Sequence, residues 1–445
     1  MTQTTPAAGL RRELGTFGAT MMGLGSIVGT GVFVSIGIAA GVAGPSVVLA
    51  IGLAGLLALC NALSSAQLAA SHPTSGGTYE YGYVYLNPWL GFSAGWMFLC
   101  AKSASAATAA LGFAGYTLVL LGDRWPGMAP PPDAASAWRV GLAGAAVLLL
   151  VAVVAAGMRR SNHVNVFIVS VTLSALAFFI VAGLPGAIDN AGSTLTPFFE
   201  SPAGDARRVL PRLLEATALM FVAYTGYGRI ATLGEEVKSP RSTIPRAILL
   251  TLAVSMLLYV AVATVGVAAA GAAAFGSAGT EEAAPLAVVA RGFEVPAAAA
   301  ILSIGAVTAM LGVLLNLILG LSRVVLAMGR RRDLPGGLAR LDDSGTTPLR
   351  AVLLVGVVIL GLVSIGSVKL AWSFSAFTVL IYYAVTNLAA IRMPAAERLY
   401  HPAIAWLGLA GCLGLAFWVE RRVWIVGLAV LGAGLILRGL LRRAG

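Results

Sequence analysis

The stretch Gly23-Leu-Gly-Ser-Ile-Val-Gly-Thr-Gly-Val-Phe33 lies within the first long apolar segment of the chain. Four of its residues are glycine, and each glycine costs a helix about 1 kcal/mol relative to alanine. We expect a membrane-spanning helix to stop and restart here, which would leave free backbone groups at mid-membrane depth. Alternatively, Gly25 and Gly29 form a GxxxG pair that lets two membrane helices pack closely.

The composition is that of a membrane protein. The chain has 445 residues, of which 58% are hydrophobic and 11% charged, and its mean hydropathy is +0.90. These values exclude a soluble enzyme. Apolar segments of about 20 residues, long enough to cross roughly 30 Å of hydrocarbon, recur along the whole length. We predict an all-α integral protein of the lipid bilayer with 12 transmembrane helices, at residues 16–41, 43–70, 88–121, 139–157, 163–184, 213–233, 246–270, 296–328, 348–366, 370–391, 402–419 and 422–440.

The distribution of basic residues predicts the orientation. A net charge of +11 would fit nucleic acid binding, but basic residues in a membrane protein mark its cytoplasmic loops. An even number of spans places both termini on one side, and Lys and Arg fall on that side about twice as often as on the other. We predict a multi-pass protein of the inner membrane, with residues 1–15 and 441–445 cytoplasmic and no nucleic acid partner.

Residue types that carry out covalent chemistry are sparse. The three cysteines and three histidines show neither metal-ligand spacing nor a disulfide framework. No nucleophile–base pair or nucleotide-binding loop accompanies them. We therefore predict no enzymatic activity, no metal site and no cofactor.

A second interruption occurs in the sixth span. The stretch Phe221-Val-Ala-Tyr-Thr-Gly-Tyr-Gly228 again places glycine and polar groups in the middle of an apolar segment. Corresponding breaks in two halves of a transporter are a sequence indication of its binding site. Each half holds five spans, an odd number, so the second half enters the membrane from the opposite face. We predict inverted repeats at residues 16–184 and 213–391, followed by two helices within 402–440.

Five groups of residues occur in a recognisable order. They are Gly25-Ser-Ile-Val-Gly-Thr-Gly-Val-Phe33 with Gly44-Pro45, Pro73-Thr-Ser-Gly-Gly-Thr-Tyr79, Phe221-Val-Ala-Tyr-Thr-Gly226, Glu235-Glu-Val-Lys-Ser-Pro240 with Pro245, and Arg332-Asp-Leu-Pro335 with Thr347-Pro348. Together they resemble the amino acid–polyamine–organocation transporter superfamily, and most closely its bacterial permeases that are similar to cationic amino acid transporters. The resemblance implies the leucine-transporter fold of five-plus-five inverted repeats, with discontinuous helices 1 and 6, and transport of amino acids or related amines.

The resemblance also implies where the substrate binds. Amide groups that begin a restarted half-helix suit a carboxylate, and carbonyl groups that end the preceding half-helix suit an ammonium. Phe221 would cover the bound substrate as a lid, although it can equally be an ordinary core aromatic residue. The implied carboxylate contacts are Ser26, Gly29, Thr30 and Gly31; the implied amine contacts are near Ile27 and from Phe221 to Tyr224; and the full implied site is Ser26, Ile27, Gly29, Thr30, Gly31, Phe221, Ala223, Tyr224 and Gly226.

The chain departs from its proton-coupled relatives in the fifth span. Those relatives carry a lysine seven residues after an asparagine; here Asn165 matches the asparagine, but Thr172 stands where the lysine would be. Thr172 is a candidate hydroxyl ligand for Na⁺, together with Ser303 or Thr308 of the eighth span. The alternative is a threonine that bonds its own helix backbone.

Two charged residues lie within predicted spans. A charge in hydrocarbon is costly and by default indicates function, so Lys102 is a candidate for lining the pathway and for H⁺ coupling in place of the missing lysine. Arg229 follows the second break and can either reach Glu235 or Glu236 or extend to the cytoplasmic interface.

Taken together, the sequence predicts secondary-active transport of an amino acid by alternating access, with the small-molecule substrate held at the two breaks. The alternatives are an exchanger or facilitator without ion coupling and a membrane sensor that binds an amino acid without moving it. A channel-like protein fits the paired breaks less well. The coupling ion, Na⁺ or H⁺, and the oligomeric state stay open.

Overall fold

The computed structural model describes residues 15–72, 76–128, 130–131, 133–157, 162–199, 208–231, 237–341 and 347–444. All the regular secondary structure in these described ranges is helical. Several residues used in the predictions lie outside the described ranges: residues 1–14 of the expected terminal segment 1–15, residues 73–75 of one quoted motif, and the acids Glu235 and Glu236.

The first half of the chain is a run of helices joined by short turns. They are α1 (Thr16–Ile27), η1 (Gly31–Ser35), α2 (Ile36–Ala43), η2 (Gly44–Ser46), α3 (Val47–Ser71), α4 (Thr78–Tyr85), α5 (Pro88–Arg124), η3 (Pro126–Met128), α6 (Ala135–Ala155) and α7 (Asn162–Thr194). The start of α5 shows why such helices begin where they do. The Asn87 side chain accepts hydrogen bonds of 3.0 Å from the N–H groups of Trp89 and Leu90, and Pro88 fills the first position, where a missing N–H costs nothing.

The second half of the chain is also a run of helices. Its helices are α8 (Val209–Tyr224), η5 (Thr225–Tyr227), α9 (Gly228–Ala231), α10 (Pro240–Ala270), α11 (Ala272–Ser277), η6 (Ala278–Glu282), α12 (Pro285–Ala290), α13 (Ala298–Arg330), η7 (Gly336–Ala339), α14 (Leu349–Ser364), α15 (Val368–Arg392), η8 (Ala395–Glu397), α16 (Pro402–Ala416) and α17 (Arg421–Ala444).

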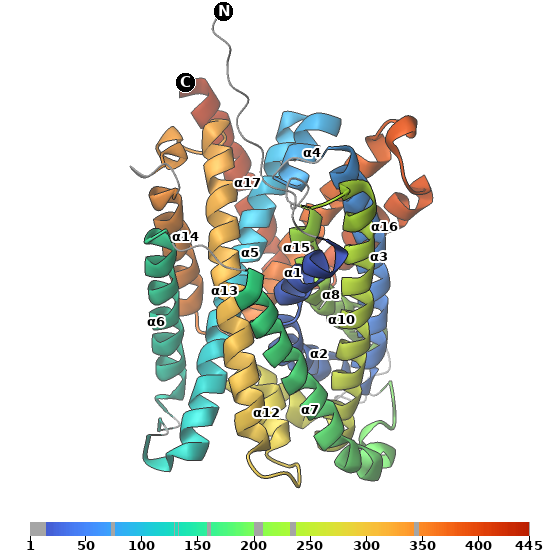
Figure 1. Cartoon of the computed structure of the whole chain (residues 1–445), viewed down its shortest axis with the longest axis vertical. Helices are drawn as coiled ribbons and strands as arrows, with labels where there is room; N and C mark the ends of the chain where they lie inside the picture. The colour runs from blue at the N-terminus through green and yellow to red at the C-terminus, as the bar shows by residue number, and fades with distance from the viewer. Residues whose placement is uncertain are drawn as a thin grey trace, which may run out of the picture.

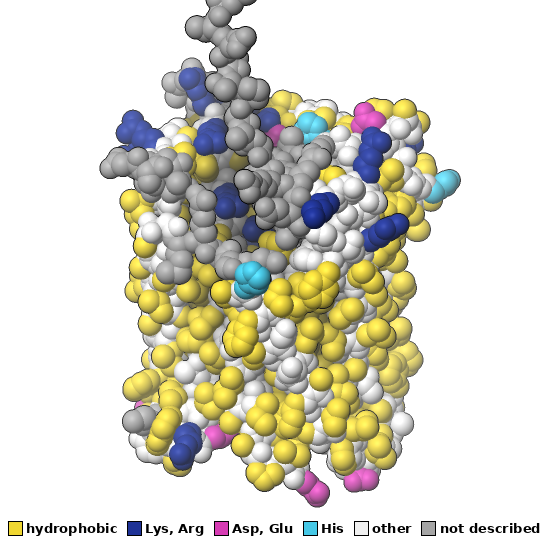
Figure 2. Space-filling model, viewed as in Figure 1, with side chains coloured by type: hydrophobic (Ala, Val, Ile, Leu, Met, Phe, Trp, Pro, Cys, Tyr) yellow, Lys and Arg dark blue, Asp and Glu magenta, His cyan; other side chains and the backbone are white. Residues whose placement is uncertain are grey.

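Length and surface both fit a bilayer. Eight helical stretches among the described residues are long and apolar enough to span a membrane, and α14 and α16 are shorter apolar helices. The first stretch, Thr16–Ser71, has 56 residues, which at about 1.5 Å per residue is long enough for two crossings. Apolar side chains cover the sides of the molecule, and charged side chains gather at its two ends (Figure 2). The chain is a multi-pass membrane protein.

The longest helices run along the long axis and surround the broken ones (Figure 1). α5 packs along α13 and α15, while α10 packs along α7 and α3. The short segments α1, α2 and α8 contact these longer helices, and α2 also contacts α8. The interrupted segments therefore lie inside the bundle, away from the lipid.

The first helix breaks within the predicted stretch 23–33, in its second half. α1 continues through Gly23 and Gly25 and ends at Ile27. A Cβ atom on Gly23 would lie 2.5 Å from Ile230 Cδ1, and one on Gly25 would lie 2.4 Å from Asn165 Oδ1. These two glycines thus permit close helix packing, the role that the GxxxG alternative assigned to Gly25, and only the later part of the stretch leaves the helix.

A fully buried ion pair lies at the end of the molecule that carries α4. Arg438 Nε of α17 lies 2.9 Å from Asp333 Oδ1, and neither side chain has exposed surface. Tyr79 Oη donates to Asp333 Oδ2 at 2.8 Å, and Tyr83 Oη donates to the same oxygen. Tyr83 Oη in turn accepts from Arg438 Nη2 at 2.9 Å, and Arg442 lies 3.5 Å from Asp333 Oδ1. We call these five residues the Asp333 cluster; it joins α4, the turn after α13, and α17.

Candidate substrate-binding site

The first break lies between α1 and η1. Val28 has φ −81° and ψ 95°, an extended conformation, and its N–H still donates to Leu24 O. The chain is helical again at Thr30, with φ −52° and ψ −34°, and η1 begins at Gly31. The carbonyl groups that end α1 and the N–H groups that begin the next segment have no partners within their own helices. The break thus offers acceptors and donors to a ligand.

The second break is milder. α8 runs to Tyr224, and a single 3₁₀ turn, Thr225–Tyr227, connects it to α9. A Cβ atom on Gly226 would lie 2.3 Å from Ser26 O and 2.5 Å from Ser26 C. Glycine at this position therefore lets the backbone of the second break touch the backbone of the first.

A tyrosine of α10 connects the two breaks. Tyr259 Oη lies 2.9 Å from Ile27 O and 3.2 Å from Ala223 O, and its single hydroxyl proton is shared between the two carbonyls. These carbonyls are the ones that the resemblance assigned to the substrate amine. Each carbonyl oxygen has two lone pairs, so each can still accept from an ammonium group.

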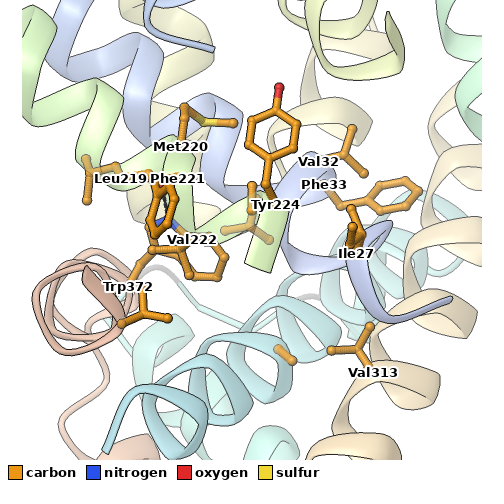
Figure 3. Packing of buried hydrophobic residues seen from close by; sticks show 14 of the residues in the cluster. Ile27, Val32, Phe33, Leu219, Met220, Phe221, Val222, Tyr224, Val313 and Trp372 are labelled. Carbon is orange, nitrogen blue, oxygen red and sulfur yellow. Dashed lines mark hydrogen bonds between the residues drawn. The ribbon is translucent and has the colours of Figure 1, made fainter. Parts of the chain in front are cut away.

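A cavity of about 40 Å³ lies where the breaks meet, with room for a few water molecules. Figure 3 shows Ile27 and Val313 on one side of the broken end of α8, and Val222 and Trp372 on the other. The cavity is lined by Ser26, Ile27, Thr30, Gly31, Lys102, Ser105, Val222, Ala223, Thr225, Gly226, Val313, Leu317 and Trp372.

The structure brings most of the predicted site residues to this cavity. From the first break these are Ser26, Ile27, Thr30 and Gly31; from the second, Ala223 and Gly226; and from α5, Lys102. Thr30 Oγ1 is buried and has no hydrogen-bond partner among the described residues. A buried hydroxyl without a partner is costly, so Thr30 is a group that a ligand would satisfy.

Three predicted residues lie beside the cavity without lining it. Gly29 faces α13, where a Cβ atom would lie 2.6 Å from Val313 Cγ2. Phe221 is fully buried, and its ring packs edge-on against Tyr383 at 5.7 Å. Tyr224 Oη donates to a backbone carbonyl of α3 at 3.2 Å. Phe221 thus sits in the core here, and the lid role assigned to it stays a prediction.

Lys102 extends from α5 toward the second break. Its Nζ donates to Thr225 Oγ1 at 2.9 Å, and Thr225 Oγ1 donates to Val222 O at 2.8 Å. The Lys102 side chain is partly accessible from the cavity. No carboxylate among the described residues forms an ion pair with it.

Lys102 lines the cavity, but the hydroxyl candidates for ion coupling lie apart from it. Thr172 Oγ1 donates to Ile168 O at 2.7 Å, and Ser303 Oγ is buried without a partner among the described residues. α13 approaches Gly29 through Val313 and the carbonyl of Ala309. Ser303 lies six residues before Ala309, which is about 9 Å along the helix.

Thr308 and Arg229 are the other two residues that the sequence suggested beside the ion-coupling candidates. Thr308 Oγ1 donates to the carbonyl of Ile304 at 2.8 Å, on an exposed face. Arg229 lies in α9, but Glu235 and Glu236, its expected partners, fall outside the described residues. Coupling through these groups therefore stays a prediction.

Sequence reasoning missed part of the cavity wall. Val222 and Thr225 belong to a quoted stretch, and their position beside the other site residues was a usable signal. Ser105 follows Lys102 by three residues, about one helical turn, and this was a usable signal. In contrast, Val313, Leu317, Trp372 and the bridging Tyr259 are single residues of long apolar helices. Nothing in their local sequence separates them from core residues.

Comparison with known proteins identifies the family. A sequence model of the amino acid permease family matches residues 18–436. The chain is 39% identical over 436 residues to an uncharacterized transporter of Mycobacterium tuberculosis, covering 97% of this chain and 92% of that protein. It is 29% identical over 443 residues to the methylthioribose transporter of Bacillus subtilis, covering 94% and 91%. It is also 30% identical over 333 residues to human cationic amino acid transporter 4, covering 73% and 50%. The chain therefore belongs to the amino acid permease family of membrane transporters.

Proposed function

We propose that the protein is a secondary-active amino acid transporter that works by alternating access. The observation that carries this proposal is the backbone contact between two interrupted helices around a small cavity. The family consists of permeases and not of enzymes. Binding between the breaks would move the protein between outward-open and inward-open states only through a difference in affinity for the two.

The substrate would lie with its charged ends on the two breaks. Its carboxylate would accept from the amides near Thr30 and Gly31, where the positive end of a helix dipole favours an anion. The unpartnered hydroxyl of Thr30 would add a donor. Its ammonium would donate to the carbonyls of Ile27 and Ala223, beside the Tyr259 hydroxyl.

The proposal includes 12 spans arranged as two inverted repeats of five, followed by α16 and α17. The contacts between helices support the repeat. α3 packs on α8 as α10 packs on α1, and α5 packs on α15 as α13 packs on α7. In the two repeats α1 corresponds to α8, α3 to α10, α5 to α13 and α7 to α15. Replacing each helix of one contact by its counterpart therefore gives the other contact.

The proposed location is the inner membrane, with both termini in the cytoplasm. Most of the Lys and Arg side chains in view lie toward the end of the molecule that carries α4, while acidic side chains lie at both ends (Figure 2). The Asp333 cluster adds Arg438 and Arg442 to the first of these ends. Basic residues favour the cytoplasmic face, which supports this orientation.

Uptake of radiolabelled amino acids into proteoliposomes tests the proposal. A carrier gives saturable uptake and counterflow against preloaded substrate. Comparing an imposed Na⁺ gradient, an imposed pH gradient and neither distinguishes coupled transport from exchange or facilitation. Ligand binding with no uptake would instead identify a sensor. Absence of both uptake and ligand-induced stabilisation across all amino acids would refute the proposal.

A further inference from the structure

The cavity has walls of two kinds. The breaks of α1 and α8 present backbone groups, which suit the carboxylate and ammonium that every amino acid shares. The remaining lining comes from α5, α13 and α15: Lys102, Ser105, Val313, Leu317 and Trp372. These side chains are left to face the part of the substrate that differs from one amino acid to another. The inference that follows rests on the proposed function.

Most of this second wall carries no charge. Val313, Leu317 and Trp372 are apolar, and the indole N–H of Trp372 is already used, since it donates to a carbonyl of α8 at 2.9 Å. Ser105 Oγ lies 2.8 Å from Ser375 Oγ, so its hydroxyl is engaged as well. Lys102 is therefore the charged group of the lining, and it faces a wall suited to methylene groups.

The Lys102 ammonium is only partly occupied. It has three N–H donors, and the hydrogen bond to Thr225 Oγ1 at 2.9 Å uses one. No carboxylate of the described residues neutralises it. A cation at membrane depth is costly without a partner. A ligand with a negative charge would therefore bind favourably to Lys102, because no protein carboxylate among the described residues already neutralises it.

We propose that Lys102 sets the substrate class, so that the transporter binds amino acids with an acidic side chain and excludes those with a cationic one. The side-chain carboxylate of aspartate or glutamate accepts from the free N–H groups of Lys102, and its methylene groups lie against the wall formed by Val313, Leu317 and Trp372. A lysine or arginine substrate would place a second cation beside Lys102 in a site of low dielectric constant. Like charges there repel strongly.

Binding of paired substrates to the purified full chain tests this directly. Aspartate is compared with asparagine, and glutamate with glutamine, by ligand-induced thermal stabilisation and by competition for uptake. Each pair has nearly the same shape, so the affinity ratio reports the charge. We expect the acid to bind at least about tenfold more tightly than its amide, because charge-assisted hydrogen bonds are stronger than neutral ones. Lysine and arginine should neither stabilise the protein nor compete.

Variants locate the effect. Lys102→Gln should bring the acid-to-amide ratio down to about one, since only a neutral donor remains. Lys102→Arg keeps the charge and should keep the preference for acids. Lys238→Gln is the matched control: Lys238 is exposed two residues before α10 and lies outside the cavity lining, so this variant should retain the wild-type ratio.

The outcomes separate the two proposals. If arginine or lysine binds the wild-type protein as tightly as glutamate, or if Lys102→Gln leaves the acid-to-amide ratio unchanged, the assignment of Lys102 is wrong while amino acid transport stands. If the wild-type protein prefers the amides, the assignment is wrong even when the Lys102 variants do not fold. If no amino acid binds or is taken up, but methylthioribose does, the proposed function itself fails.

Discussion

Replacing Asp333 with asparagine would leave a charge without its partner in the interior. Asp333 accepts hydrogen bonds from Tyr79, Tyr83 and Arg438, and neither it nor Arg438 has exposed surface. Asp333→Asn keeps the size of the side chain but removes the negative charge. Breaking a buried ion pair by removing one partner costs about 3–5 kcal/mol, and we expect a loss of this size in the free energy of unfolding.

The chain offers a matched control for this substitution. Asp123 pairs with Arg291 at 2.8 Å, but their side chains are 35% and 44% exposed. An exposed pair contributes about 0–1 kcal/mol, so Asp123→Asn should cost little. The double variant Asp333→Leu with Arg438→Met should recover much of the lost stability, because it buries no charge.

Denaturant-induced unfolding in detergent micelles measures all of these variants together. The single variants Asp333→Leu and Arg438→Met, measured beside the double variant, complete a double-mutant cycle, which isolates the coupling between the two side chains. The reasoning is refuted if Asp333→Asn costs no more than Asp123→Asn. It is also refuted if the double variant is less stable than Asp333→Leu by the full cost of Arg438→Met alone, since that would mean the two charges act independently.

Three further predictions concern the breaks and the Asp333 cluster. Gly226→Ala should lower substrate affinity at least about tenfold, because the new Cβ atom would lie 2.3 Å from the Ser26 carbonyl oxygen. Gly320→Ala places its Cβ atom in open space and should bind substrate as the wild type does. Equal affinities of the two variants would contradict the importance of the contact. Tyr259→Phe should cost about 1 kcal/mol in free energy of unfolding, the typical net value of a hydrogen bond, and an unchanged midpoint would argue against the bridge. Burial, and then the hydrogen bond to the carboxylate, raise the pKa of Tyr83 to about 12, above its ordinary value of about 10. The stability held by the neutral phenol is thus complete below pH 10 and lost as pH rises toward 12; Tyr83→Phe should reduce that loss, and an identical alkaline profile for variant and wild type would oppose it.

The sequence predicted the breaks because their residues are neighbours in the chain. Glycines and polar groups in the middle of an apolar segment weaken a helix, so together they indicate an interruption, and Lys102 stood out as a charge in the same kind of segment. The predicted stretch contains the first break, but two of its glycines, Gly23 and Gly25, serve packing against Ile230 and Asn165 instead. A glycine that ends a helix and one that admits a neighbouring helix look alike until the neighbour is known.

The rest of the site could not be predicted from local patterns. Val313, Leu317 and Trp372 reach the cavity because α13 and α15 pack against α5, and packing is a property of the whole bundle. The same holds for Tyr259, whose hydroxyl meets carbonyls from two distant segments. These residues look like ordinary core residues in the sequence, and only the folded chain separates them.

The Asp333 cluster also sets an order for the making of the protein. Arg438 follows Asp333 by 105 residues in the chain, which a ribosome takes on the order of 5–20 s to add. During that interval Tyr79 and Tyr83 are already synthesised, while the cation is not. In the nascent chain, the Asp333 carboxylate therefore has the hydroxyls of Tyr79 and Tyr83 as hydrogen-bond donors before its cationic partner exists. The end of the bundle formed by α4 and the turn after α13 can therefore become fully ordered only once α17 has been inserted, so assembly of this end finishes last.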